Sequence, residues 1–528
     1  MKKKVLSLIL ALAMVISIAP LTFAADAKGL ENFKKVNTYE SGKFSDISSG
    51  DWYYGNVVSA YETGLIKGSS ENSFNPKGNI TVAETIALAS RLHSIYNGGK
   101  GEFTQGNPWY QVYVDYATEN KILREKYKDY NAKISRANFA FILVNALPSD
   151  AFDAINDVPD GTLPDVPDNY KASAIYTLYR AGVLTGNDEF GTFKPDSTIT
   201  RAEVAAIITR MADKSQRKAL ALKRKATVSE EVYRGALGYA NMTFENNYGM
   251  ALSDNLDENI GYGMTGADLL KQQAMSLITE FEAVRLFATE NGIKLSDTDR
   301  KAIAAAKEQA YKAYGGKEAF ISALKEDNVN EAFYDYLLES QMYYQKASEL
   351  FGENGKFPVD TDAIAETLSG NYKRVKHILI QADATKENYK EKEALAKQIL
   401  QKISRGEDFE KLLKEYGEDP GMEVSPDGYM MDNNGNTFGG GQLVAEFTEG
   451  SNALKVGEVS GIVKTAYGFH IIKRYPIDKT FTDSFIKANM ETFSANALTN
   501  TLGAFAAKVG ISNIEDLEKI DLHTVFGK

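Results

Sequence analysis

Histidine is rare in this chain of 528 residues, and two of its four copies, His377 and His470, each lie inside a short apolar segment. The first segment, VKHILI, alternates in the way that half-buried strands do. A single histidine in a strand is most often a hydrogen-bonded core residue. The presence of two such histidines in one region makes that interpretation less favoured.

The segments around these histidines predict an α+β domain between Arg374 and Pro476. After VKHILI, the stretch EKEALAKQILQKISRGEDFEKLLKEYG predicts two helices separated by Gly406. A Gly/Asn-rich stretch follows, and LVAEF, LKVGEVSGIVKT and YGFHIIKRY then predict a helix and a strand pair. Both histidines therefore fall on strands, which would hold them rigidly.

The motifs HILI, GEDF and VGEVSGIVKTAYGFHIIK resemble the parvulin family of peptidyl-prolyl isomerases, over residues 375–476. Phe447 stands ten residues before Gly457 of VGEVS, as it does in that family. The resemblance implies two groups of site residues, catalytic His377, Asp419 and His470, and substrate-binding Leu443, Phe447 and Tyr467. Leu443 replaces a common methionine, which should keep the pocket apolar.

The implied reaction is rotation about X-Pro bonds, which amide resonance opposes by about 18–20 kcal/mol. An apolar pocket around the proline ring disfavours the planar amide, and a hydrogen-bonding network favours the twisted form. We expect the histidines to orient and tune polarity, with no nucleophile, no metal and no cofactor. The alternative is a parvulin fold of weak activity that serves as a holdase.

The stretch before Leu443 departs from the parvulin pattern. The usual glycine-rich turn reads SPDGYMM, and DNNGNTFGGG adds length, so residues 425–441 form an altered loop. We expect this loop to bulge into solvent, the alternative being that it covers the pocket. FGGG is not a nucleotide fingerprint. No basic cluster follows HILI, so a preference for phosphorylated clients is not expected.

A weak repeat occupies the first part of the chain, where an aromatic residue is followed twelve residues later by a helix-ending position. The three pairs are Trp52 and Gly64, Trp109 and Lys121, and Tyr170 and Gly182. A second helix follows in each unit, opened by the N-cap residues Thr81, Ser135 and Thr200. One unit is too small to bury its apolar face, so the three should pack together.

These units resemble the surface-layer homology (SLH) family, through an Asp near the leading aromatic, a glycine turn and TRAE at the last helix. We place repeat 1 at residues 44–98, repeat 2 at 107–152 and repeat 3 at 155–211. The resemblance implies an all-α three-repeat bundle that binds the secondary cell-wall polymer, often through a pyruvylated sugar. An anionic ketal is suited to guanidinium groups at helix starts.

The resemblance implies polymer binding by Trp52, Trp109, Arg136 and Arg201. The alternatives are that the tryptophans belong to the core and that the arginines are surface charges. Repeat 1 carries Val82 where the arginine belongs, so its groove should bind poorly.

The remaining segments predict helices on both sides of the isomerase domain. We assign residues 212–227 to a basic linker, 228–374 to a helical chaperone-like region, and 477–528 to helices that return to it. This split resembles foldases whose terminal helices form a chaperone lobe around a parvulin domain. Such a lobe would bind unfolded or partly folded exported proteins with X-Pro bonds.

Residues 1–25 read as an export signal, with three lysines, an apolar run and small residues near Ala24. Cleavage would change the net charge from −11 to −14, which disfavours nucleic acid as a partner. No transmembrane anchor is expected, and with no cysteine the chain cannot carry a lipid on one. We expect a secreted protein of the cell wall or S-layer, at the outer face of the cytoplasmic membrane.

The sequence thus predicts a multidomain protein with an all-α repeat bundle, a helical chaperone lobe and an inserted α+β parvulin domain. The predicted function is a wall-anchored isomerase and chaperone. Besides the holdase, the alternative is a structural surface-layer protein.

Overall fold

The computed structural model describes residues 29–261, 263–352 and 354–528, so the predicted signal peptide lies outside the described residues. The chain divides into two compact units. One contains the residues up to Ala347 together with Thr499–Lys528, and the other contains Ser348–Leu498. The second unit is therefore inserted into the first. Within the described ranges, every helix is too short or too polar to cross a membrane.

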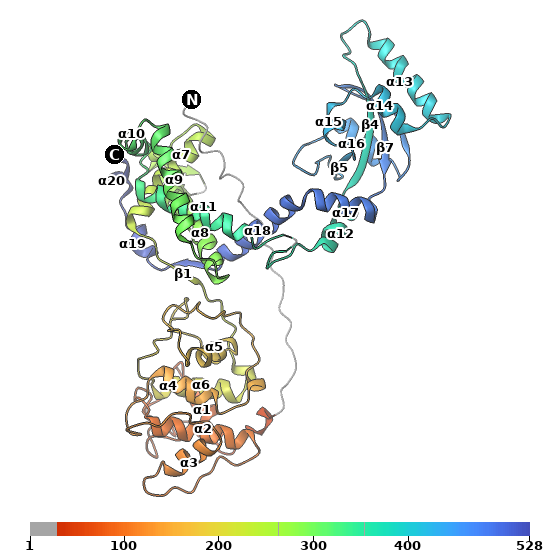
Figure 1. The fold of residues 1–528 in the computed structure, drawn as a ribbon. Coiled ribbons are helices and arrows are strands. Elements are labelled where there is room, and N and C mark those ends of the chain that lie inside the picture. Colours follow the sequence, from red (N-terminus) through yellow and green to blue (C-terminus); the bar gives the residue numbers. More distant parts are fainter. Residues whose placement is uncertain (1–28, 262, 353) are drawn as a thin grey trace. The chain divides into compact units, whose positions relative to one another are not determined.

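Six α-helices form the part of the first unit that contains the repeats (Figure 1). They are α1 (Tyr54–Glu62), α2 (Val82–Tyr96), α3 (Gln111–Glu119), α4 (Arg136–Val144), α5 (Ala172–Arg180) and α6 (Arg201–Ala212). Thr81 and Thr200 cap α2 and α6 with reciprocal bonds to Glu84 and Glu203, and Ser135 caps α4. The predicted N-caps are confirmed, and their helices bury apolar faces in one continuous core.

Each repeat is joined to another through the start of its second helix. The first two backbone N–H groups of that helix donate to carbonyls of a neighbouring repeat. The pairs are Val82 and Ala83 to Ala132 and Tyr130, Arg136 and Ala137 to Ser197 and Pro195, and Arg201 and Ala202 to Gly78 and Pro76. Helix-start N–H groups lack partners within their own helix. The three joints satisfy them and close a ring of three repeats.

A second helical region has its own core and belongs to the first unit except for Ser348 and residues 490–498, which belong to the second. Its elements are β1 (Arg224–Ala226), α7 (Glu230–Tyr248), β2 (Asn259–Gly261), β3 (Met264–Thr265), α8 (Gly266–Glu290), α9 (Asp297–Ala313), α10 (Lys317–Glu326), α11 (Glu331–Ser348), α18 (Met490–Ala506), β8 (Val509–Ile511), α19 (Ile514–Glu518) and α20 (Leu522–Phe526). Strands β1 and β8 pair in parallel, so segments on either side of the inserted unit meet.

The segment predicted to be a basic linker is held by specific contacts. Arg217 donates to the carbonyl of Ala151 at 2.6 Å, and Arg224 pairs with Glu290 at 2.7 Å. Both arginines are buried. The segment therefore packs against structured parts of the chain, because its charges find carbonyl and carboxylate partners there.

The second unit contains a four-stranded antiparallel sheet in the order β5-β4-β7-β6 (Figure 1). Its elements are α12 (Thr361–Asn371), β4 (Lys373–Gln381), α13 (Tyr389–Ser404), α14 (Phe409–Tyr416), α15 (Pro420–Val424), β5 (Tyr429–Met431), α16 (Ala445–Asn452), β6 (Val459–Thr465), β7 (Gly468–Tyr475) and α17 (Lys479–Ala488). A multidomain chain with many helices and a small sheet in the inserted unit confirms the coarse predicted class, whereas the three-repeat SLH bundle stays a prediction. Helices α13 and α14 pack on one face with Ile378 and Ile471, and α16 packs on the other with Val375 and Ile472.

The two parts of the altered loop, residues 425–441, differ. Tyr429 in its first part lines the pocket, whereas residues 432–441 do not line it and are mostly exposed, as expected, with one apolar contact. The ring of Phe438 lies 5.0 Å from that of Phe485 in α17 and 5.3 Å from that of Phe493 in α18. Phe438, an apolar residue among mostly exposed polar ones, thus packs the loop against α17 and α18. The Gly/Asn-rich composition around Phe438 gave no indication of this contact.

Candidate functional site

Strands β4 and β7 bring His377 and His470 together. Their register pairs Leu379 with His470 and His377 with Ile472, so the two imidazoles project from the same face, one step apart. Both histidines are nearly fully buried, and their rings stack with centroids 5.1 Å apart. The two Nδ1 atoms lie 3.0 Å apart, which is hydrogen-bonding distance.

Asp419 joins the pair from the start of helix α15, where it is the N-cap residue. Its Oδ2 accepts from Nε2 of His377 at 2.7 Å and from the hydroxyl of Tyr429 at 2.7 Å. Its Oδ1 accepts from the backbone N–H of Gly421 at 3.0 Å. Burial alone would raise the pKa of Asp419, but the three donors hold it well below its ordinary value.

One arrangement of protons satisfies every bond of this cluster with both histidines neutral. Since Asp419 only accepts, Nε2 of His377 carries the proton and its Nδ1 must accept. Nδ1 of His470 then donates to it, which leaves Nε2 of His470 to accept from the hydroxyl of Thr465 at 2.8 Å. The backbone N–H of Tyr467 in turn donates to Thr465. Thr465, His470, His377 and Asp419 are thus linked by a directional chain of hydrogen bonds, in which every donor points toward Asp419.

Burial lowers the pKa of His470 to about 4, with a smaller contribution from the nearby His377 and against the opposing effect of Asp419, which supports the neutral state of His470. His470 is therefore uncharged at neutral pH.

A pocket of about 780 Å³ opens beside the histidines. Phe447 is buried in its wall, with its ring edge-on to the imidazoles of His377 and His470 at 4.9 and 5.3 Å. Leu443 extends this apolar wall, and Tyr467 lines the pocket while remaining exposed. All six residues predicted for the isomerase site therefore line one pocket.

Sequence reasoning missed two polar residues that bond to the site residues, Tyr429 and Thr465. Tyr429 lies in the altered SPDGYMM segment, where only its position in a strand paired with Val375 reveals its direction. Thr465 ends β6 opposite Gly468, so it reaches His470 across the hairpin. A hydroxyl five residues before the histidine, on the partner strand, was the available signal.

The pocket combines an apolar wall with a preorganised polar chain. Within the described ranges, no group of histidine and acidic side chains could hold a metal ion. Such a site can bind a proline-sized ring and present fixed dipoles to an amide whose charge distribution changes.

The leading aromatics of the repeats are exposed. Trp52 and Trp109 are 66% and 37% exposed, and Tyr170 is 64% exposed. Each precedes the first helix of its repeat by two positions. The interpretation of the tryptophans as core is wrong, since tyrosines and other side chains fill the core beneath them.

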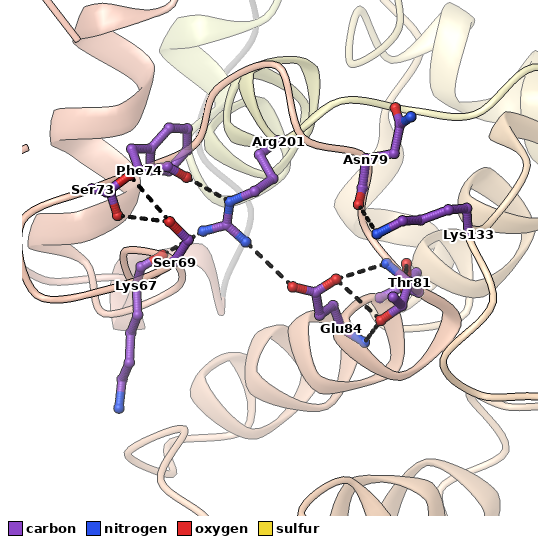
Figure 2. A network of polar contacts seen from close by, with 10 residues as sticks. Lys67, Ser69, Ser73, Phe74, Asn79, Thr81, Glu84, Lys133 and Arg201 are labelled. Carbon is purple, nitrogen blue, oxygen red and sulfur yellow. Dashed lines mark hydrogen bonds and ion pairs between the residues drawn. The ribbon is translucent and has the colours of Figure 1, made fainter. Parts of the chain in front are cut away.

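Arg201 lies at the joint between repeats 3 and 1 (Figure 2). Its Nε donates to the carbonyl of Phe74 and its Nη2 to that of Lys67, each at 2.7 Å, and Nη1 lies 3.5 Å from Glu84. The guanidinium also stands 5.0 Å from the ring of Phe74. Figure 2 shows the side chain reaching across from α6 into the loop of repeat 1.

Arg136 makes the equivalent contacts between repeats 2 and 3. Its Nε donates to the carbonyl of Phe193 at 2.7 Å, and Nη1 pairs with Glu203 at 2.6 Å. It is buried, so the alternative that these arginines are plain surface charges is wrong. The joint that starts at Val82 lacks such a guanidinium, and there Lys133 donates to the carbonyl of Asn79 at 2.7 Å.

Known proteins resemble both regions. A model of the PPIC-type PPIASE domain matches residues 364–475, and a model of the S-layer homology domain matches residues 43–86 and 162–205. Foldase protein PrsA of Geobacillus kaustophilus is 45% identical over 106 residues, which are 20% of this chain and 32% of that protein. This chain therefore matches about a third of that relative's length.

Foldase protein PrsA 1 of Listeria monocytogenes serovar 1/2a is 30% identical over 228 residues, which cover 41% of this chain and 69% of that protein. A crystal structure of a peptidylprolyl isomerase (PrsA) from Bacillus cereus is 22% identical, with a TM-score of 0.23. That match covers 53% of this chain and 100% of the other.

Proposed function

The chain belongs to the family of PrsA foldases, and we propose on this basis that it is a cell-wall-anchored peptidyl-prolyl cis–trans isomerase and chaperone for exported proteins. The PPIC-type domain would supply the isomerase, the SLH domains the anchor, and the second helical region the surface for non-native chains. The observation that carries the proposal is the directional chain of Asp419, His377, His470 and Thr465 beside an apolar pocket.

The proposed mechanism uses the two sides of the pocket differently. Phe447 and Leu443 grip the proline ring, and this apolar contact disfavours the charge-separated planar amide. The hydrogen-bonded histidine pair and Asp419 provide fixed dipoles that favour the twisted amide without reorganisation. No bond to the substrate forms or breaks, so His377 and His470 act by orientation and polarity.

The isomerase activity is tested by exchange spectroscopy on an Ala-Pro peptide, which needs no coupling protease. The protein should accelerate interconversion, and Asp419→Asn should lower kcat/KM about 100-fold, because the histidine pair loses its charged acceptor. Glu418→Gln is the matched control, since Glu418 adjoins Asp419 but bonds Lys392 and Gln381 instead. Absence of acceleration by the unsubstituted protein contradicts the proposal.

We also propose that residues 44–98, 107–152 and 155–211 are three SLH repeats that bind the secondary cell-wall polymer. The three equivalent joints support the inclusion of the middle repeat. Trp52 and Trp109 offer exposed rings to sugars. Arg136 and Arg201 offer their remaining N–H groups to an anion such as a pyruvyl ketal, Arg136 less so because it is buried.

This anchor would hold a secreted protein at the cell wall or S-layer, near the outer face of the cytoplasmic membrane, where exported chains emerge. Sedimentation with purified wall fragments tests it. Binding should be lost once the polymer is stripped from the peptidoglycan, and binding that survives stripping contradicts the polymer as partner.

The chaperone role is supported by exposed apolar side chains in the second helical region. Tyr248 ends α7 and Met250 lies two residues after it, and their side chains are 72% and 41% exposed. Apolar area of this kind can hold non-native segments weakly. Clients would be unfolded or partly folded exported proteins, with X-Pro bonds that the inserted domain acts on.

A further inference from the structure

Tyr429 bonds directly to the carboxylate that orients the histidine pair. Its hydroxyl lies 2.7 Å from Oδ2 of Asp419, the same oxygen that accepts from Nε2 of His377. The ring is half-buried, lines the pocket and lies 5.7 Å from the imidazole of His377. Burial and the bond to Asp419 raise the pKa of Tyr429, so the hydroxyl keeps its proton and donates it.

The surroundings are shaped around this hydroxyl. Pairing of Tyr429 with Val375 directs its side chain to the pocket face, whereas the next residue, Met430, joins a cluster on the other face. A Cβ on Gly421 would lie 1.8 Å from the hydroxyl oxygen, so any side chain there would displace the hydroxyl. Gly421 also donates its N–H to Oδ1 of Asp419. Gly421 thus contributes to both carboxylate oxygens of Asp419. Its N–H binds Oδ1, and its lack of a side chain leaves room for the hydroxyl that binds Oδ2.

We propose that Tyr429 is a positioning residue of the isomerase site, whose hydroxyl fixes the carboxylate of Asp419 so that Oδ2 faces the Nε2–H of His377. The inference rests on the proposed function, since it assigns a role within that site. With both oxygens held by three donors, Asp419 has one orientation. That orientation fixes the tautomer of His377 and, through it, the direction of every later bond in the chain.

Tyr475 provides a matched control within the same domain. Its hydroxyl donates to Glu410, so it makes the same kind of tyrosine–carboxylate bond. Tyr475 ends β7 and does not line the pocket. Replacing either tyrosine with phenylalanine removes one hydroxyl and keeps the ring, so a general loss of stability should affect both variants alike.

The first readout is steady-state kinetics on an Ala-Pro peptide with the complete protein. Tyr429→Phe should lower kcat about tenfold, because the released carboxylate samples other orientations. KM should stay within about twofold, since the ring remains in the pocket wall. Tyr475→Phe should leave both constants within about twofold of the unsubstituted protein.

The second readout is nitrogen-15 NMR after selective histidine labelling, which is practical because the chain has four histidines. His377 should show a protonated Nε2 and His470 a protonated Nδ1. Tyr429→Phe should move the Nε2–H signal of His377, and Tyr475→Phe should not. A signal unchanged by Tyr429→Phe overturns the proposal, whatever the kinetics show.

Gly421→Ala gives an independent check through a double-mutant cycle. In the unsubstituted protein the new methyl group must displace the tyrosine hydroxyl, so kcat should fall about as much as in Tyr429→Phe. In the Tyr429→Phe background the same change should add little, and fully additive losses contradict the inference. If the unsubstituted protein itself fails to accelerate isomerisation, the proposed function fails, while the His377 signal still decides the role of Tyr429.

Discussion

The isomerase pocket and the joints between repeats use predicted polar residues in opposite ways. In the pocket, His377, His470 and Asp419 bond mainly to one another, and their chain borders an open cavity. At the joints, Arg136 and Arg201 donate to backbone carbonyls and capping glutamates of another repeat. A polar side chain can bind a ligand only through the hydrogen-bonding groups that its partners within the protein do not already occupy.

The loops that meet the arginines are built to present these carbonyls. Asn75 and Lys194 adopt positive φ at the same place in repeats 1 and 3, directly after Phe74 and Phe193. Their backbone N–H groups are held by the carboxylates of Asp46 and Asp165. The aspartates near the leading aromatics, first noted as family marks, thus shape the turn that receives each arginine.

The largest expected effect is on the joints. Arg201→Ala should lower the free energy of unfolding of the repeat region by about 3 kcal/mol, because the carbonyls of Phe74 and Lys67 lose their donor. Both tryptophans of the chain, Trp52 and Trp109, lie in the repeats. Denaturant unfolding followed by tryptophan fluorescence therefore reports on this region within the complete protein.

Arg124→Ala is the control for this measurement, because Arg124 is exposed in repeat 2 and should change stability by less than about 0.5 kcal/mol. Equal effects of the two substitutions would remove the distinction drawn between joints and pocket. A large effect confined to wall binding, with unchanged unfolding, would do the same.

A smaller effect is expected from pH, and only in the pocket. Burial and His377 lower the pKa of His470 from 6.5 to about 4, so its neutral form persists to lower pH than that of a free imidazole. Below about pH 4 a proton occupies Nε2, which can then no longer accept from Thr465. We expect kcat/KM to stay level from pH 8 to about 5 and to fall about tenfold per unit below 4.

Exchange spectroscopy on the Ala-Pro peptide measures this profile, with tryptophan fluorescence as the check that the repeats stay folded at each pH. A midpoint near 6.5 would show that His470 titrates as an ordinary exposed histidine. The hydrogen-bonded residues of the pocket would then not be shielded from solvent, and this difference between the pocket and the joints would be lost.

The sequence could place His377 and His470 beside one pocket because strands carry positional information. A histidine within an alternating segment has a defined face, and two adjacent antiparallel strands place His377 and His470 on one side. Phe447 could be predicted as a pocket residue because it stands ten residues before Gly457, as in the parvulin family. Tyr429 lay where that pattern breaks, so its role emerged only from the register of β5 with β4.

The repeats were harder, because their arginines act across sequence distances that no local pattern encodes. Thr81 and Thr200 could be identified as N-caps from neighbouring residues alone. The partner of Arg201, however, is a loop 127 residues away. The anchoring of Phe438 was likewise hidden, since its partners lie on helices that follow the isomerase domain.

The smallest expected effect on stability separates exposed rings from buried guanidinium groups within the repeats. Trp52→Ala should change the free energy of unfolding by less than about 0.5 kcal/mol, since the side chain is 66% exposed. It should still weaken binding to wall fragments about fivefold, the loss of roughly 1 kcal/mol of ring contact with sugar. Tyr248→Ala, an equally exposed aromatic outside the repeats, should leave wall binding unchanged. If Trp52→Ala binds wall fragments normally while Arg201→Ala does not, the polymer is recognised at the joints. The buried guanidinium groups, and not the exposed rings, would then be the residues that bind the polymer.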